Sequence, residues 1–131
     1  MNRVKILVAD NDENILSAFH DYLRRKNYSM TGVTNVETGL KKIRQQNFNL
    51  IITDVRLNSE FGTNFISKIK AARSNLSIIA ITSYPDKINE KELRTYGADY
   101  LFVKPLELNK LDEAIENCLK SKSTKIIENK Q

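Results

Sequence analysis

Four short apolar segments of this sequence are each followed directly by side chains that can take part in polar chemistry. The segments span residues 4–9, 50–53, 77–81 and 100–103, and the polar residues after them are Asp10 with Asn11, Asp54, Thr82 with Ser83, and Lys104. Apolar runs without polar alternation are typical of parallel strands buried on both faces. Since the carboxyl ends of parallel strands meet at one edge of a sheet, the four polar groups are expected to lie together there.

This combination of side chains suits the transfer of a phosphoryl group to a carboxylate. The oxygens of Asp10 and Asp54 are ligands of the type that Mg²⁺, a hard cation, prefers. One carboxylate can attack phosphorus as a nucleophile. The hydroxyl of Thr82 and the ammonium of Lys104 can then take up charge on the phosphoryl oxygens.

The elements that must position these groups alternate between strand and helix patterns five times. Strands are predicted at 4–9, 28–34, 50–54, 77–82 and 100–103, and helices at about 13–27, 36–45, 63–73, 88–96 and 109–119. Short connections between such units predict a parallel sheet with helices on both faces. The predicted fold class is therefore α/β, a three-layer (βα)5 doubly wound parallel sheet with the flavodoxin-like strand order 2-1-3-4-5.

Individual residues predict where several helices begin and end. Asp12 and Asn35 are suited to cap the first and second helices. Gly97 fits the position just after the fourth helix. The segment from Leu57 to Gly62 is expected to be a loop.

The 131 residues are sufficient for one domain with a single well-formed core. We expect this domain to span residues 1–120 and residues 121–131 to form a polar C-terminal tail or the start of a linker. No apolar run approaches the roughly 20 residues needed to span a bilayer, and no signal peptide is evident. We therefore expect a cytoplasmic protein without a membrane partner.

The net charge of +5 raises the question of nucleic-acid binding. The basic clusters fall at the ends of separate predicted helices, where cations favour the carbonyl end of the helix dipole. Aromatic residues do not alternate with them, so direct nucleic-acid binding is not expected. The single cysteine, Cys118, is interpreted as a buried inert thiol, and His20 as an exposed or half-packed residue without a metal.

The strand ends carry motifs that resemble the receiver domains of two-component response regulators over about residues 4–119. The matching segments are Ile6-Leu7-Val8-Ala9-Asp10, Ile51-Ile52-Thr53-Asp54-Val55-Arg56-Leu57 with Gly62 beyond it, Ile79-Ala80-Ile81-Thr82-Ser83, and Gly97-Ala98-Asp99 through Val103-Lys104-Pro105. Each motif alone has little specificity. Because all four occur in order and on the expected elements, together they make the resemblance to this family strong.

This resemblance implies a role for each site residue. Asp54 would be the phosphoacceptor, and Mg²⁺ would be held by Asp10, Asn11, Asp54 and the backbone carbonyl of Arg56. Thr82 would bind a phosphoryl oxygen and draw its loop inward. Lys104 would pair first with Asp54 and then with the phosphoryl group, and its bond to Pro105 would be cis.

The resemblance also implies the partners. A sensor histidine kinase or a phosphotransfer protein would supply the phosphoryl group. A downstream protein or a fused output domain would read the phosphorylated state, and a phosphorylation-linked homodimer is a further expected form. The domain would be a signalling phosphoacceptor rather than an enzyme, although it would assist its own phosphorylation and dephosphorylation.

Three positions depart from the family pattern. Asn11 stands where a second acid is usual, so magnesium binding is expected to be weaker. Leu101 replaces the usual Tyr or Phe three residues before Lys104, so a ring-based switch is not expected. Asn58 and Phe61 replace a frequent Pro and acid before Gly62.

Two other functions fit parts of the sequence. A phosphorylation-independent interaction module would keep the fold but lose efficient chemistry through Asn11. A haloacid-dehalogenase-type phosphatase would use Asp10 as nucleophile and Asp12 as general acid. The phosphatase leaves Asp54 without a role, and it lacks later metal-binding acids at a strand end.

Overall fold

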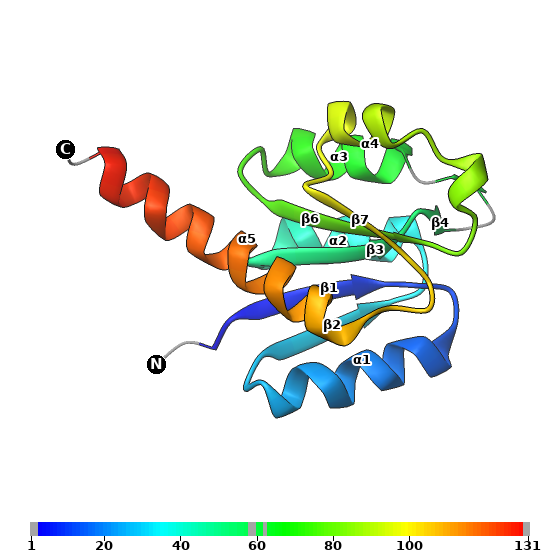
Figure 1. Ribbon diagram of the computed structural model, residues 1–131, viewed down its shortest axis with the longest axis horizontal. Coiled ribbons are helices and arrows are strands. Elements are labelled where there is room, and N and C mark those ends of the chain that lie inside the picture. The colour runs from blue at the N-terminus through cyan, green and yellow to red at the C-terminus, as the bar shows by residue number, and fades with distance from the viewer. Residues whose placement is uncertain (1–2, 58–59, 62, 130–131) are drawn as a thin grey trace.

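The computed structural model describes residues 3–57, 60–61 and 63–129. Strands and helices alternate along the chain, as the sequence predicts (Figure 1). The strands are β1 (Lys5–Ala9), β2 (Ser29–Val33), β3 (Leu50–Asp54), β4 (Arg56–Leu57), β5 (Glu60–Phe61), β6 (Ser77–Thr82) and β7 (Tyr100–Val103). The helices are α1 (Glu13–Arg25), α2 (Val36–Gln45), α3 (Thr63–Ala72), the 3-10 turn η1 (Pro85–Lys87), α4 (Glu90–Tyr96) and α5 (Leu108–Asn129).

The longer strands form one parallel sheet of five in the order β2-β1-β3-β6-β7. Numbered within this sheet alone, the order is 2-1-3-4-5, which confirms the predicted topology. The chain runs outward from β1 to β2 and then crosses back over β1 to reach β3. The strand order therefore reverses between β1 and β3, and ligand crevices in open α/β sheets lie at such a reversal.

Alternate side chains of each strand enter two separate hydrophobic cores, because successive residues point to opposite faces of the sheet. From β1, Leu7 and Ala9 enter the core beneath α2, α3 and α4. Ile6 and Val8 enter the core beneath α1 and α5. The segment Leu50–Ile52 is fully buried, as expected for a strand covered on both faces. The three-layer arrangement is thus confirmed.

The predicted helix caps are also present. The side chain of Asp12 accepts a hydrogen bond from the backbone N–H of Asn14 at 2.8 Å and caps α1. The side chain of Asn35 accepts one from the backbone N–H of Thr38 at 2.9 Å and caps α2. Gly97 ends α4 with a positive φ of 123°.

Two connections differ from the sequence expectation. The segment expected to be only a loop contains the antiparallel pair of β4 and β5, while Asn58, Ser59 and Gly62 lie outside the described residues. The fourth helix begins at Glu90 rather than near Ile88, because η1 precedes it and the side chain of Asn89 caps its first turn.

The last helix is longer than expected. It begins at Leu108 rather than Asn109 and continues past Leu119 to Asn129. Neither glycine nor proline occurs after Pro105, so the sequence contains no strong helix breaker in this region. The division into a domain and a tail at residue 120 stays a prediction.

Polar contacts fix α5 against α1. The hydroxyl of Tyr22 donates a hydrogen bond to the carboxylate of Asp112. The ammonium of Lys26 lies 3.0 Å from the other oxygen of the same carboxylate. Because α5 follows directly after the loop that carries Lys104, this contact helps to fix the end of that loop.

Two predictions about single residues, and one about membrane-spanning segments, can be compared with the structure. Cys118 is buried in the core beneath α1 and α5, as predicted. His20 is exposed, and its imidazole lies 3.9 Å from Asp21. None of the helices in the described ranges has the length and apolar composition needed to cross a bilayer.

The positive φ of Gly97 generates a stability prediction. A Cβ atom at position 97 would lie 2.4 Å from Cγ of Lys70, whose ammonium donates to the carbonyl of Leu76 at 2.6 Å. We expect Gly97→Ala to lower the free energy of unfolding by about 1–3 kcal/mol, through backbone strain and displacement of Lys70. Chemical denaturation measures this change. Gly32→Ala is the control, because its Cβ would meet only flexible side chains; equal stability of the two variants would contradict the prediction.

Candidate functional site

The register of the sheet brings the four polar strand ends to one edge. Residues 9 and 53 are partners across β1 and β3, residues 54 and 81 across β3 and β6, and residues 82 and 103 across β6 and β7. The residues that follow or complete these strands therefore lie at the carboxyl edge of the sheet. This edge is where the sequence predicts the site.

Lys104 connects the two carboxylates of the site directly. Its ammonium lies 2.9 Å from Oδ2 of Asp10 and 2.8 Å from Oδ2 of Asp54. All three side chains are largely buried, with exposed fractions of 18%, 7% and 12% for Lys104, Asp10 and Asp54. Charge-assisted hydrogen bonds in such partly dry surroundings are stronger than neutral ones.

The second oxygen of each carboxylate is held by the backbone. Oδ1 of Asp10 accepts the N–H of Asp12 at 2.9 Å, and Oδ1 of Asp54 accepts the N–H of Arg56 at 2.8 Å. Each carboxylate is therefore fixed at both oxygens. Each oxygen still has an electron pair available, since a carboxylate can accept about four hydrogen bonds.

Burial and pairing affect the ionisation of this cluster in opposite directions. Burial raises the pKa of Asp10 above its ordinary value, and the N–H of Asp12 and the ammonium of Lys104 offset this only in part. Burial alone would lower the pKa of Lys104, but its hydrogen bonds to Asp54 and Asp10 outweigh burial, and the pKa is raised. Lys104 thus stays protonated at neutral pH.

Thr82 ends β6 with its side chain almost completely buried. Its Oγ1 accepts the backbone N–H of Tyr84 at 2.9 Å. A hydroxyl that accepts one hydrogen bond can still donate its own proton. The carbonyl of Thr82 accepts the N–H of Lys104 at 2.8 Å, so these two residues are also connected through the backbone.

The donor set at this edge is suitable for Mg²⁺. The two carboxylates, the side chain of the exposed residue Asn11 and the carbonyl of Arg56 would each offer an oxygen atom, the kind of donor that this ion prefers. The described part of the chain contains no group of three or more His, Cys, Asp or Glu placed to hold a metal. The site therefore presents two acids, and the third polar position is the neutral Asn11.

The two aromatic residues of β7, the fifth strand of the sheet, lie on the face opposite Leu101. Leu101 packs against the core beneath α2, α3 and α4. Tyr100 and Phe102 pack against the other core, with ring centroids 6.3 Å apart. Consequently no aromatic ring of β7 occupies the position of Leu101.

Two further observations concern the residues around the site. The Lys104–Pro105 peptide bond is cis, as the resemblance implies. Asp12, the general acid of the phosphatase interpretation, is the N-cap of α1.

The sequence interpretation missed a contact beside the site. The guanidinium of Arg56 lies over the ring of Tyr84, 5.3 Å from its centroid. The sequence does indicate this contact through spacing. Arg56 stands two residues after Asp54, and Tyr84 stands two residues after Thr82, so both are at the same distance along the chain from a strand end.

A family model and the similar known proteins point to the same family. The family model described as "Response regulator receiver domain" matches residues 6–116. The transcriptional regulatory protein RprY of Bacteroides fragilis is 28% identical over 118 residues, which is 90% of this chain and 50% of RprY. The chain therefore spans about half the length of this relative.

Solved structures agree with this match. A CheY-like response regulator receiver domain protein from Methanospirillum hungatei has a TM-score of 0.86 and 26% identity, with coverage of 95% of this chain and 99% of that one. TrrA from Thermotoga maritima, solved in complex with Mg²⁺ and BeF, has a TM-score of 0.79 and 27% identity, with coverage of 88% and 99%.

The neutral Asn11 generates a prediction for metal affinity. We expect Asn11→Asp to bind Mg²⁺ about tenfold more tightly than the wild type, because ligand charge raises affinity for hard cations by about 1–2 kcal/mol here. Titration with Mg²⁺, monitored by calorimetry or NMR, measures the change in affinity. Asn47→Asp, at an exposed position in the connection before β3, is the control. Equal affinities of wild type and Asn11→Asp would refute the prediction.

The bridging ammonium generates a prediction for stability against pH. We expect Lys104→Met to lower the free energy of unfolding by about 3 kcal/mol at pH 8, since it leaves two carboxylates without their cation. Without the ammonium, the pKa of Asp10 rises further above its value in the unfolded chain, so the folded variant binds a proton more tightly. Its deficit should therefore shrink as the pH falls toward 5.

Chemical denaturation at both pH values tests this effect. Lys110→Met removes an exposed ion pair with Glu107 and serves as the control, with little change at either pH. A deficit that stays constant or grows toward pH 5 would show that Lys104 does not control the ionisation of Asp10.

Proposed function

Because the chain belongs to the response regulator receiver domain family, whose members are signalling domains, we propose that Asp54 is its phosphoacceptor. The observation that supports this most strongly is the shared ammonium of Lys104 between Asp10 and Asp54. A carboxylate fixed at the edge of a sheet by Lys104 and the N–H of Arg56, with an electron pair available, is a suitable nucleophile.

In the proposed reaction, an oxygen of Asp54 attacks the phosphorus of a phosphohistidine on a partner kinase or phosphotransfer protein. A new O–P bond forms as the N–P bond breaks, and the electron pair stays on the donor's imidazole nitrogen. Lys104 neutralises charge that arrives with the phosphoryl group, and Thr82 donates its hydroxyl proton to a phosphoryl oxygen. Water later reverses the modification by breaking the P–O bond, and both of its protons leave with inorganic phosphate.

The charge of the site explains why a divalent ion belongs to the proposal. Two carboxylates and one ammonium leave one net negative charge, and an acyl phosphate at Asp54 adds roughly one more. Mg²⁺ held by Asp10, Asn11, Asp54 and the carbonyl of Arg56 would supply the positive charge that this product needs. The domain thereby assists its own phosphorylation and dephosphorylation, although it has no substrate apart from its own side chain and the donor.

The partners follow from the same proposal. The phosphoryl donor is a sensor histidine kinase or a phosphotransfer protein, and the phosphorylated state alters contacts with a downstream protein, a fused output domain or a second copy of the chain. The cytoplasm is the proposed location. The regulator RprY is about twice as long as this chain, and the proposal concerns the receiver domain alone.

One observation favours a second candidate, an interaction module that works without phosphorylation. Asn11 leaves the site with two acids, and weak metal binding would slow the transfer. Against this candidate, Asp54, Thr82 and Lys104 are all retained and lie at one edge of the sheet.

The proposal predicts which aspartate is modified. Incubation with acetyl phosphate and millimolar Mg²⁺ should add one phosphoryl group to the wild type and none to Asp54→Asn, because an amide is not a nucleophile of this kind. Intact-mass spectrometry with peptide mapping of the reduced acyl phosphate measures both. Asp21→Asn, at an exposed aspartate of α1, should behave like the wild type.

The other outcomes separate the candidates. A wild type that never forms an acyl phosphate, even with a partner kinase, would favour the interaction module. Modification of Asp10 instead of Asp54 would revive the phosphatase interpretation.

A further inference from the structure

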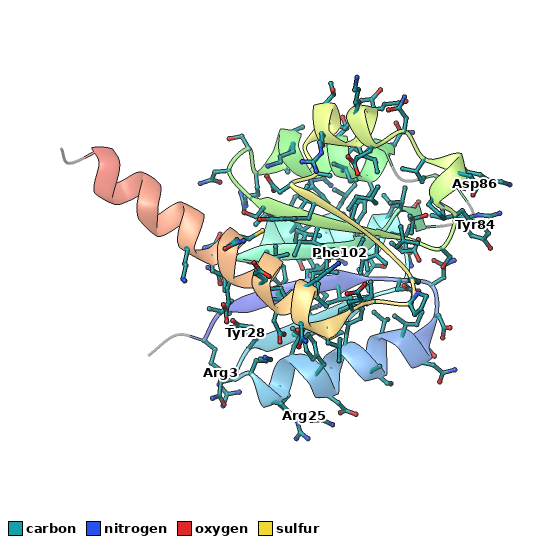
Figure 2. All side chains as sticks on the ribbon, in the orientation of Figure 1. Arg3, Arg25, Tyr28, Tyr84, Asp86 and Phe102 are labelled. Atoms are coloured by element: carbon teal, nitrogen blue, oxygen red, sulfur yellow. The ribbon has the colours of Figure 1, made fainter. Side chains whose placement is uncertain are left out.

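A cation–π contact joins the two loops that carry Asp54 and Thr82. The guanidinium carbon of Arg56 lies 5.3 Å from the centroid of the Tyr84 ring, and the ammonium of Lys87 lies 6.0 Å from the same centroid. Both distances fall within the range of attraction between a cation and an aromatic face. Figure 2 shows Tyr84 at the end of the molecule where Figure 1 marks β4. We call Arg56, Tyr84 and Lys87 the Tyr84 clasp.

Both partners of the main contact are connected to the site through their backbone. The N–H of Arg56 is donated to Oδ1 of Asp54 at 2.8 Å, and the N–H of Tyr84 is donated to Oγ1 of Thr82 at 2.9 Å. A movement of Thr82 toward Asp54 therefore carries Tyr84 with it. The contact between the ring and the guanidinium affects the free-energy cost of that movement.

Burial does not account for the position of the Tyr84 ring. Tyr84 is 42% exposed, among the most exposed large apolar side chains of the described residues. The two cations supply a specific attraction for its ring. The third member, Lys87, lies in η1, where its N–H is donated to the carbonyl of Tyr84 at 3.1 Å. The clasp thus holds the start of the connection from β6 to α4 against the residues after β3.

We propose that Arg56 and Tyr84 are positioning residues, which hold the Thr82 loop beside the acceptor loop before the phosphoryl group arrives. This inference rests on the proposed function and extends it. A loop that is already held in place loses less conformational freedom when Thr82 binds the phosphoryl oxygen, and preorganisation of this kind strengthens binding. Neither side chain needs to touch phosphorus for this effect.

Side-chain variants can test the clasp, since the backbone groups of both residues remain. Tyr84→Leu and Arg56→Gln each remove the contact, whereas Tyr84→Phe keeps the ring. Tyr96→Leu, at another exposed tyrosine on α4, and Arg24→Gln, at an exposed arginine of α1, are matched controls. Each variant is measured in the whole 131-residue chain.

The first measurement is hydrogen exchange of the backbone amide at position 84 by NMR, without any phosphoryl donor. We expect exchange about two- to five-fold faster in Tyr84→Leu and Arg56→Gln, the factor that an exposed cation–π contact provides. The second measurement is the apparent affinity for beryllofluoride with magnesium, which mimics the phosphoryl group. We expect it to weaken by about the same factor. Tyr84→Phe and both controls should match the wild type in both measurements.

The outcomes separate this inference from the proposed function. Unchanged exchange would show that the clasp does not hold the loop, whatever happens at Asp54. Faster exchange with equal or tighter beryllofluoride binding would overturn the positioning role. If the wild type itself fails to bind beryllofluoride, the proposed function fails and the positioning role with it, while the exchange data still decide whether the clasp exists.

Discussion

The ion triad of Asp10, Asp54 and Lys104 is the constraint on which the site depends. One ammonium satisfies two carboxylates that are more than four-fifths buried, and each carboxylate uses its remaining oxygen to bind a backbone N–H. Removing Lys104 would leave both buried carboxylates without compensation, which costs several kcal/mol. The triad therefore has to be assembled by the fold with the correct geometry. Burial raises the pKa of Asp10. Burial alone would lower the pKa of Lys104, but its hydrogen bonds to Asp54 and Asp10 outweigh burial and raise it.

The topology of the sheet supplies this geometry. Because β1 lies between β2 and β3, Asp10 and Asp54 leave neighbouring strands at the same edge. Lys104 comes from β7, two strands away from β3, and its long side chain spans the remaining distance over β6. The hydroxyl of Thr82 belongs to that intervening strand, so it lies between the strand that ends in Asp54 and the strand that leads to Lys104. A different strand order would separate these groups even with the same residues at the strand ends.

Much of this arrangement follows from the sequence alone. The strands that carry Asp10, Asp54 and Thr82 are continuous apolar runs, and a parallel sheet brings their ends together. The family resemblance implied that Lys104 pairs with Asp54, as the structure shows. Its second contact, with Asp10, and the strand pair after Asp54 did not follow from the sequence, since neither local propensity nor spacing defines which oxygen a long side chain reaches. The helix α5 extends beyond Leu119 because its polar residues contain no breaker, although polar composition suggested a tail. The contact of Arg56 with Tyr84 was missed because it joins two connections that are distant in sequence and structurally adjacent only after the sheet has formed.

Asn11 affects the charge of the site in both the unmodified and the phosphorylated state of the proposed reaction. With an acid at this position, the site would carry an additional negative charge, and its attraction for a divalent cation would be greater before transfer. With the neutral asparagine, the charge of a bound divalent cation, together with Lys104, equals that of Asp10 and a doubly charged acyl phosphate. Under the proposed function, Asn11 would therefore weaken metal binding by the unmodified protein, whereas the charges of the phosphorylated form with its metal would cancel. Loss of one acid is consequently compatible with retention of Asp54, Thr82 and Lys104 as a working set.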